Sequence, residues 1–118
     1  MKTVLQIEFS PSLLSEREAV LKRSGYPTIS VLGSSNARNL DLSAPGIGVI
    51  VVGHGAPWLE RHGLIAHFRE ALPGVPIVAL LRRNDDPFSE ADFNCPSDNP
   101  PLWERTVTQA LGRNVGTN

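Results

Sequence analysis

The stretch GVIVVGHGAP, residues 48–57, decides the fold, because a run of branched apolar residues ends there abruptly in a glycine-rich turn. The apolar residues do not alternate with polar ones, which is typical of a parallel strand that helices cover on both faces. In such sheets, the loops at the carboxyl ends of the strands form the binding site. The stretch therefore predicts a central buried strand that ends at Gly53 and a candidate site in the loop that follows.

The segments on either side of this strand alternate between strand and helix patterns. Strands are expected at 4–7, running into Glu8, and at 28–32, 47–52, 75–81 and 91–95. Helices are expected at 11–24, in one or two turns between 34 and 45, after 57 as far as 72, and at 102–111, where Gly112 ends the last one. Residues 82–90 leave too little chain for a full helix, so the fourth helix is reduced. Right-handed crossovers then predict an α/β fold with a doubly wound parallel five-stranded sheet in the order 2-1-3-4-5.

The composition fits one small domain of 118 residues, which we place at 1–112 with a flexible polar tail at 113–118. The formal charge is only -1, from 11 basic and 12 acidic residues, and it gives no electrostatic reason to expect nucleic acid or an anionic membrane as partner. No apolar stretch approaches the roughly 20 residues that cross a bilayer. The single Cys95 and the absence of a signal-peptide pattern lead us to expect a cytoplasmic protein.

The predicted strand order brings one set of residues to a common rim: Glu8, Phe9, Gly53, His54, Leu81, Arg82 and Cys95. Glu8 and Arg82 are expected to approach each other across this rim. Such a partly exposed ion pair contributes about 0–1 kcal/mol. Alternatively, Arg82 fills the space of a cation and holds the pocket in one permanent state. Arg17 interrupts the apolar stripe of the first helix and is expected at the edge of that stripe.

The order and spacing of these segments resemble the receiver domain of two-component response regulators over about residues 3–112. VLQIEFSP at 4–11 looks like the first strand of that family with its acidic cluster, and LKRSGY at 21–26 looks like its first helix end. Residues 49–57 resemble the third strand, after which the next element begins behind a proline, and LPGVPIVAL at 72–80 resembles the passage into the fourth strand. The resemblance implies a flavodoxin-like fold.

Receivers of this family accept a phosphoryl group on an aspartate, hold Mg²⁺ with acidic residues and sense phosphate with a Ser or Thr and a Lys. At the matching positions, Gly53 replaces the aspartate, Phe9 replaces the acidic partner of Glu8, Leu81 replaces the Ser or Thr, and Cys95 replaces the Lys. A lone carboxylate is a poor Mg²⁺ site. We therefore expect a pseudo-receiver without metal, cofactor or enzymatic activity. It would act on a signalling protein by direct contact. Whether it also forms a homodimer is left undecided by the sequence.

The turn at 53–55 also resembles the Gly-His-Gly segment of sirohydrochlorin chelatases, where a histidine at a strand end serves metal insertion. The alternative hypothesis is therefore a small metal-dependent α/β enzyme that uses His54. His62 and His67 both lie on the following helix, off its apolar face, and are expected to be solvated. Pro57 removes one of the N–H groups that a phosphate-binding loop would need. A third hypothesis is a small-molecule sensor at the vacated pocket.

Other residues near the rim have two interpretations each. Trp58 and Phe88 would anchor an interface if they were exposed together, and otherwise they belong to the core. The charges of residues 82–86 could form a recognition loop, although charge runs more often mark a solvated surface. Cys95 fits a small buried core residue better than a redox thiol.

Overall fold

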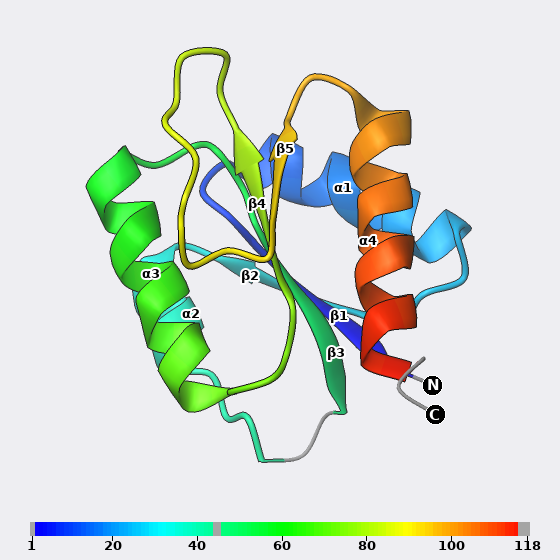
Figure 1. The fold of residues 1–118 in the computed structure, drawn as a ribbon. Helices are drawn as coiled ribbons and strands as arrows, with labels where there is room; N and C mark the ends of the chain where they lie inside the picture. Colours follow the sequence, from blue (N-terminus) through cyan, green and yellow to red (C-terminus); the bar gives the residue numbers. More distant parts are fainter. Residues whose placement is uncertain (1, 44–45, 116–118) are drawn as a thin grey trace.

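The computed structural model describes residues 2–43 and 46–115, and these form a five-stranded sheet between two layers of helices (Figure 1). The elements in chain order are β1 (Thr3–Glu8), α1 (Pro11–Arg23), β2 (Thr28–Leu32), α2 (Ser34–Arg38), β3 (Ile47–Val52), α3 (Trp58–Ala71), β4 (Ile77–Leu81), β5 (Phe93–Pro96) and α4 (Pro100–Val115). Helices α2 and α3 cover one face of the sheet, and α1 and α4 cover the other.

All the strand pairs are parallel, and the strand order is β2-β1-β3-β4-β5. This order confirms the predicted doubly wound architecture. Strand β3 lies at the centre, between β1 and β4, and every one of its residues is buried. Its unbroken apolar sequence follows from this position, because side chains on both faces of the strand meet a helical layer.

The hydrophobic core has two parts, one on each face of the sheet. The larger part lies against α3 and includes Ile50, Leu64 and Phe68, all fully buried. The second part lies beneath α1 and α4, where Trp103 of α4 is 2% exposed and packs with Val107. In the described parts of the chain, no helix is both long enough and apolar enough to cross a bilayer.

The element boundaries agree closely with the pattern in the sequence as far as α3, and they differ more from there on. Strand β4 begins at Ile77 rather than at residue 75, β5 is Phe93–Pro96 rather than 91–95, and α4 begins at Pro100 rather than at residue 102. Helix α4 passes through Gly112 and ends at Val115, so the prediction that Gly112 ends the helix is wrong. A glycine inside a helix costs only about 1 kcal/mol relative to alanine, which the buried face of α4 can offset. Residues 116–118 of the predicted tail lie outside the described residues.

The connection between β4 and β5 contains no helix, as we predicted from the short length of residues 82–90. It is nevertheless tied down by its own hydrogen bonds. Phe88 donates its N–H to Oδ1 of Asn94 at 2.8 Å and accepts a bond from Nδ2 of the same side chain at 3.0 Å. Arg69 of α3 pairs with Asp92 at 2.7 Å. The connection is therefore an ordered loop fastened to α3 and β5, and it lies beside α3 in Figure 1.

Candidate functional site

The ends of β1 and β3 bring Glu8 and Gly53 into direct contact, as the strand order predicted. The Gly53 N–H donates to the Ile7 carbonyl oxygen at 2.8 Å. A Cβ atom added to Gly53 would overlap Oε1 and Cδ of Glu8 and would lie 2.5 Å from its Oε2, whereas ordinary contacts of a Cβ begin at 3.4 Å. The carboxyl group of Glu8 therefore occupies the space that any side chain at residue 53 would need.

Arg17 of α1 is the ionic partner of Glu8. Its Nη1 lies 2.5 Å from Glu8 Oε2, and the exposed fractions of the two side chains are 7% and 0%. The expected pair between Glu8 and Arg82 does not form, and Arg17 is buried rather than placed at the edge of the apolar stripe of α1. Burial raises the pKa of Glu8, and the charge and hydrogen bond of Arg17 partly oppose this rise.

His54 extends this pair to a third residue. Nη2 of Arg17 lies 3.2 Å from His54 Nδ1. Because a guanidinium only donates, Nδ1 acts as the acceptor and carries no proton in this arrangement. Partial burial lowers the pKa of His54, and the neighbouring charge of Arg17 lowers it further. Glu8, Arg17 and His54 are therefore linked in that order, and the histidine at the end of this series is neutral.

A second buried arginine, Arg61 of α3, joins the loop after β3 to the connection after β4. Its side chain is fully buried, and its Nε donates to the Ala56 carbonyl at 2.8 Å. Its two terminal nitrogens bond both carboxylate oxygens of Asp85 at 2.9 and 3.0 Å. Asp85 also accepts the backbone N–H of Arg82 at 2.7 Å. The hydrogen bond from Arg61 lowers the pKa of Asp85, despite some desolvation.

The remaining predicted rim residues do not complete a common pocket with Glu8 and Gly53. Phe9 packs against Gly55, where an added Cβ would lie 3.2 Å from the Phe9 Cβ. Leu81 packs against the core on the α3 side. Cys95 lies on β5, and β3 and β4 stand between this strand and β1.

Cys95 is a core residue. It is 3% exposed and packs beneath α4, where the Thr106 hydroxyl donates to its Sγ at 3.8 Å. Burial raises the pKa of the thiol, and the hydrogen bond from Thr106 opposes this only in part. Reactive cysteines have a lowered pKa and an exposed sulfur, so the interpretation as a small buried core residue is confirmed.

The residues around Gly53 do not fit a Mg²⁺ ion. The buried carboxylate at this position is Glu8, whose Oε2 already binds the Arg17 guanidinium. Its Oε1 is buried and has no hydrogen-bond partner among the described residues. Mg²⁺ prefers six oxygen ligands in an octahedron, and the fixed positive charge of Arg17 would repel the ion. We therefore derive no metal-dependent step from this site.

The hypothesis of a metal-dependent enzyme finds no support in the geometry of His54. Nδ1 of this histidine is bonded to Arg17. Within the described residues, no group of three or more His, Cys, Asp or Glu side chains is placed to hold a metal. His62 and His67 are partly exposed on α3, in accordance with their expected solvation.

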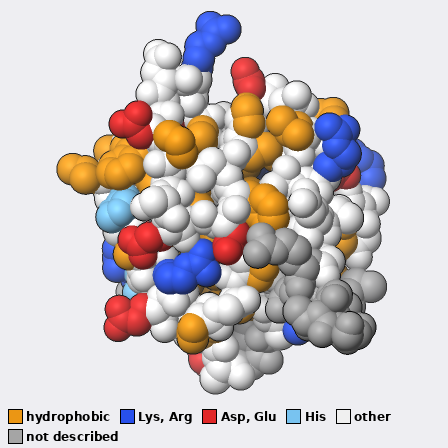
Figure 2. All heavy atoms as spheres, viewed as in Figure 1, with side chains coloured by type: hydrophobic (Ala, Val, Ile, Leu, Met, Phe, Trp, Pro, Cys, Tyr) orange, Lys and Arg blue, Asp and Glu red, His pale blue; other side chains and the backbone are white. Residues whose placement is uncertain are grey.

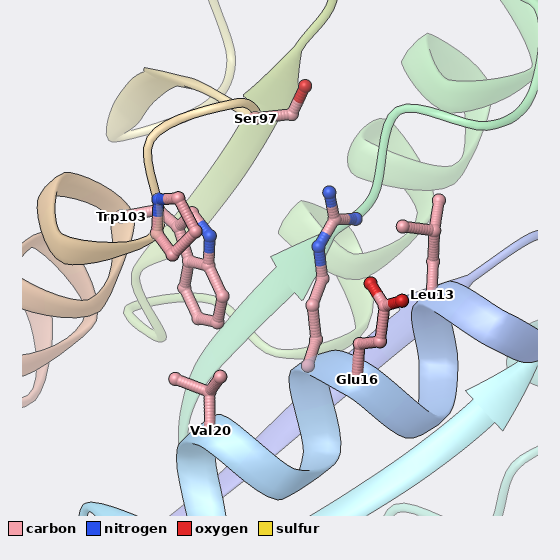
Figure 3. A pocket seen from close by; sticks show the side chains of 7 residues that line it. Leu13, Glu16, Val20, Ser97 and Trp103 are labelled. Atoms are coloured by element: carbon pink, nitrogen blue, oxygen red, sulfur yellow. The ribbon is translucent and has the colours of Figure 1, made fainter.

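Two hollows border the site, and neither of them has Glu8 or Gly53 in its lining. One, of about 260 Å³, lies at the carboxyl ends of β4 and β5 and includes Arg82, Arg83 and Asp98 in its lining. The other, of about 170 Å³, lies between α1 and the start of α4. Figure 3 shows Trp103 of α4 across from Leu13 and Glu16 of α1. Neither hollow is the vacated pocket that a small-molecule sensor would use, because Glu8 fills that space.

Sequence reasoning did not identify Arg17 or Arg61 as site residues. Arginines on a helix are usually solvated, and neither residue forms part of a recognisable motif. A signal for Arg17 did exist in β1, where Gln6 and Glu8 put two polar side chains on the face that α1 covers. A buried carboxylate needs a cation or donors from the covering helix.

No protein-family model matches the chain, and no curated protein matches it in sequence. Solved structures match it over nearly its whole length. The receiver domain of an HD domain-containing protein from Pseudomonas fluorescens Pf-5 shares 14% identity, with a TM-score of 0.83 and 98% of each chain covered. The CheY-like receiver domain protein of Methanospirillum hungatei JF-1 shares 13% identity, with a TM-score of 0.80, 100% of this chain covered and 99% of that one.

A third similar structure is the complex of the histidine kinase ThkA with the response regulator TrrA, a protein of Thermotoga maritima. The matched chain of this complex shares 17% identity with the present chain, with a TM-score of 0.78, and the match covers 94% of the present chain and 99% of the matched one. Identities this low establish the fold and do not establish shared chemistry. The chain thus has the flavodoxin-like fold of response-regulator receiver domains.

Proposed function

We propose that this protein is a pseudo-receiver of two-component signalling, which acts through contact with another protein and without phosphoryl transfer. The observation that carries the proposal is the contact between Glu8 and Gly53. In the proposed correspondence with receivers, Gly53 stands at the phosphoacceptor position, and the carboxyl group of Glu8 fills the space of the missing side chain. Arg17 supplies a built-in cation to that carboxylate through its Oε2.

The correspondence at the other positions supports the same proposal. Leu81 carries no hydroxyl group that could bond a phosphate. Cys95 carries no positive charge and is buried beneath α4. A phosphoryl group at the end of β3 would therefore find neither a nucleophilic carboxylate at residue 53 nor the usual ligands of its oxygens.

A protein partner is the kind of ligand that this fold suggests. The matched regulator TrrA was solved together with a histidine kinase, and we extend to this chain only the expectation of a signalling protein as partner. The connection between β4 and β5 has a loop where receivers have a helix. Dimerisation through the usual receiver face is therefore not part of the proposal.

Incubation of the full chain with acetyl phosphate and Mg²⁺, followed by intact-mass spectrometry, tests this proposal. We expect an unchanged mass under conditions that label an active receiver run in parallel. A second measurement guards against loss of a labile acyl phosphate. NMR spectra recorded with Mg²⁺ and beryllofluoride should show no shifts at residues 8, 53 and 54. A phosphoryl adduct, or saturable shifts at these residues, would overturn the proposal.

A further inference from the structure

The first turn of α3 carries the most exposed large apolar side chain among the described residues, Leu59, which is 77% exposed. Pro57, two residues before it, is exposed, and Trp58 is partly buried. Figure 2 shows hydrophobic side chains gathered over this end of α3, with a histidine beside them. We call the surface formed by Pro57, Trp58, Leu59, His62 and Pro87 the Leu59 surface.

This surface rests on a rigid support. The Trp58 ring lies between two other rings, with centroids 5.1 Å from His62 and 4.9 Å from Phe88, and both pairs are stacked nearly parallel. The indole N–H of Trp58 donates to the Asp86 carbonyl at 2.9 Å. Phe88 itself is 1% exposed and lies at 5.3 Å beneath the Arg61 guanidinium. A surface that is already ordered loses little conformational entropy when a partner binds.

The rim of the Leu59 surface is acidic. Glu60, Asp86 and Glu90 are exposed around it. Arg61, in the same turn of α3, is fully buried and paired with Asp85, so its charge is not presented to solvent. His62 lies 3.7 Å from Glu90. Of the arginines on neighbouring elements, Arg69 pairs with Asp92 and also donates to the backbone carbonyl oxygen of Glu90. Nη2 of Arg38 would lie 3.2 Å from a Cβ added to Gly63, and Arg82 and Arg83 line the hollow at the ends of β4 and β5.

We infer that the Leu59 surface docks a protein segment that presents an apolar side chain flanked by lysines or arginines. The apolar side chain would pack on Leu59 and the Trp58 edge, where contact area contributes most to affinity. The basic flanks would meet the carboxylates of Glu60, Asp86 and Glu90, which favours the encounter and the choice of partner. This inference rests on the proposed role as an interaction module and assigns that role to a particular face.

Selection of random short peptides displayed on phage, with the full chain as bait, tests the inference without a known partner. Wild-type protein should enrich peptides that combine an apolar residue with neighbouring Lys or Arg. Synthetic versions of these peptides should shift the NMR signals of residues 57–62 and 86–90. Their affinity should fall as the salt concentration rises, because exposed charges are screened.

Matched variants locate the binding. Leu59→Ser should lower the affinity for the peptides about tenfold or more, as loss of a central interface residue does. Glu60→Lys combined with Glu90→Lys should lower this affinity too. Leu32→Ser, at the end of the edge strand β2 and outside the Leu59 surface as defined, should leave peptide binding unchanged, since Leu32 is the other exposed large apolar residue among those described. Thermal unfolding should be alike in all the variants, because these side chains are exposed.

The inference is overturned by failure to enrich peptides, by enriched peptides without basic residues, or by equal binding to Leu59→Ser. It is also overturned if analytical ultracentrifugation shows that the chain associates with itself through Leu59, because a second copy would then be the occupant. These outcomes are distinct from a failure of the proposed function. Phosphorylation of the chain would refute the pseudo-receiver, whereas the peptide selection reports only on the surface.

Discussion

Replacing Gly53 with alanine should destabilise the protein strongly. The new Cβ would overlap the carboxyl group of Glu8, so either this side chain must leave its position or the backbone must shift. If Glu8 moves away, the buried guanidinium of Arg17 loses its ionic partner. Breaking a buried ion pair costs about 3–5 kcal/mol. This is a large share of the roughly 5–15 kcal/mol that stabilises a typical domain, and the folded fraction should fall measurably.

Urea denaturation followed by circular dichroism measures this effect, and a double-variant background isolates its cause. In a chain that already carries Glu8→Ala and Arg17→Met, the further change Gly53→Ala should cost less than about 1 kcal/mol, because the overlapping carboxyl is absent. Gly46→Ala is the matched control, since among the described residues, its chain neighbours aside, nothing lies within 4 Å of its added Cβ. We expect its stability to stay within about 0.5 kcal/mol of wild type. An equal cost of Gly53→Ala in both backgrounds would refute the reasoning.

Three further predictions concern the network around this position and the core. Because burial and Arg17 lower the pKa of His54 below its usual 6.5, the unfolded chain binds the proton more readily. Stability due to this residue is therefore lost as the pH falls through about 6.5, and His54→Asn should flatten the pH dependence of urea midpoints between about pH 7.5 and 5.5. Arg61→Met leaves Asp85 without its bidentate partner and should cost about 3–5 kcal/mol in urea denaturation. Arg69→Met removes a more exposed pair and should cost only about 0–1 kcal/mol, and similar costs for both variants would contradict the buried role of Arg61. The Cys95 thiol, whose pKa is raised by burial, should react with Ellman's reagent only after denaturation, and prompt labelling of the native protein would contradict its position in the core.

The fold could be predicted from the sequence because its strongest signals are local. The apolar run of β3 has no alternation, which is possible only where both faces are covered. Short connections and right-handed crossovers then leave few topologies. The error at Gly112 has the same origin, because a local rule for helix ends was applied where packing of the preceding turns carries the helix onward.

The site could be predicted only in part, because its partners are far apart in the sequence. The strand order correctly brought Glu8 and Gly53 together, since strand ends share an edge of the sheet. The partner of Glu8 depended on which helical residue turns inward, and the guanidinium of Arg17 reaches it from α1. Pairing with Arg82 was expected from proximity at the rim. The buried carboxylate of Glu8 instead pairs with Arg17, which is buried beside it, because a buried charge needs a partner.

The contact between Glu8 and Gly53 determines what a substitution at residue 53 would do. On the proposed correspondence with receivers, Gly53→Asp would not restore a phosphoacceptor, because the new side chain would have to displace Glu8. Arg17 would still lie beside the carboxylates, and residues 81 and 95 would still supply neither a hydroxyl nor an ammonium group. Changing residue 53 alone would therefore destabilise the protein without supplying the other groups that a receiver uses. Glu8, Arg17 and Gly53 form one packed arrangement, in which glycine is the residue that lets Glu8 and Arg17 pair.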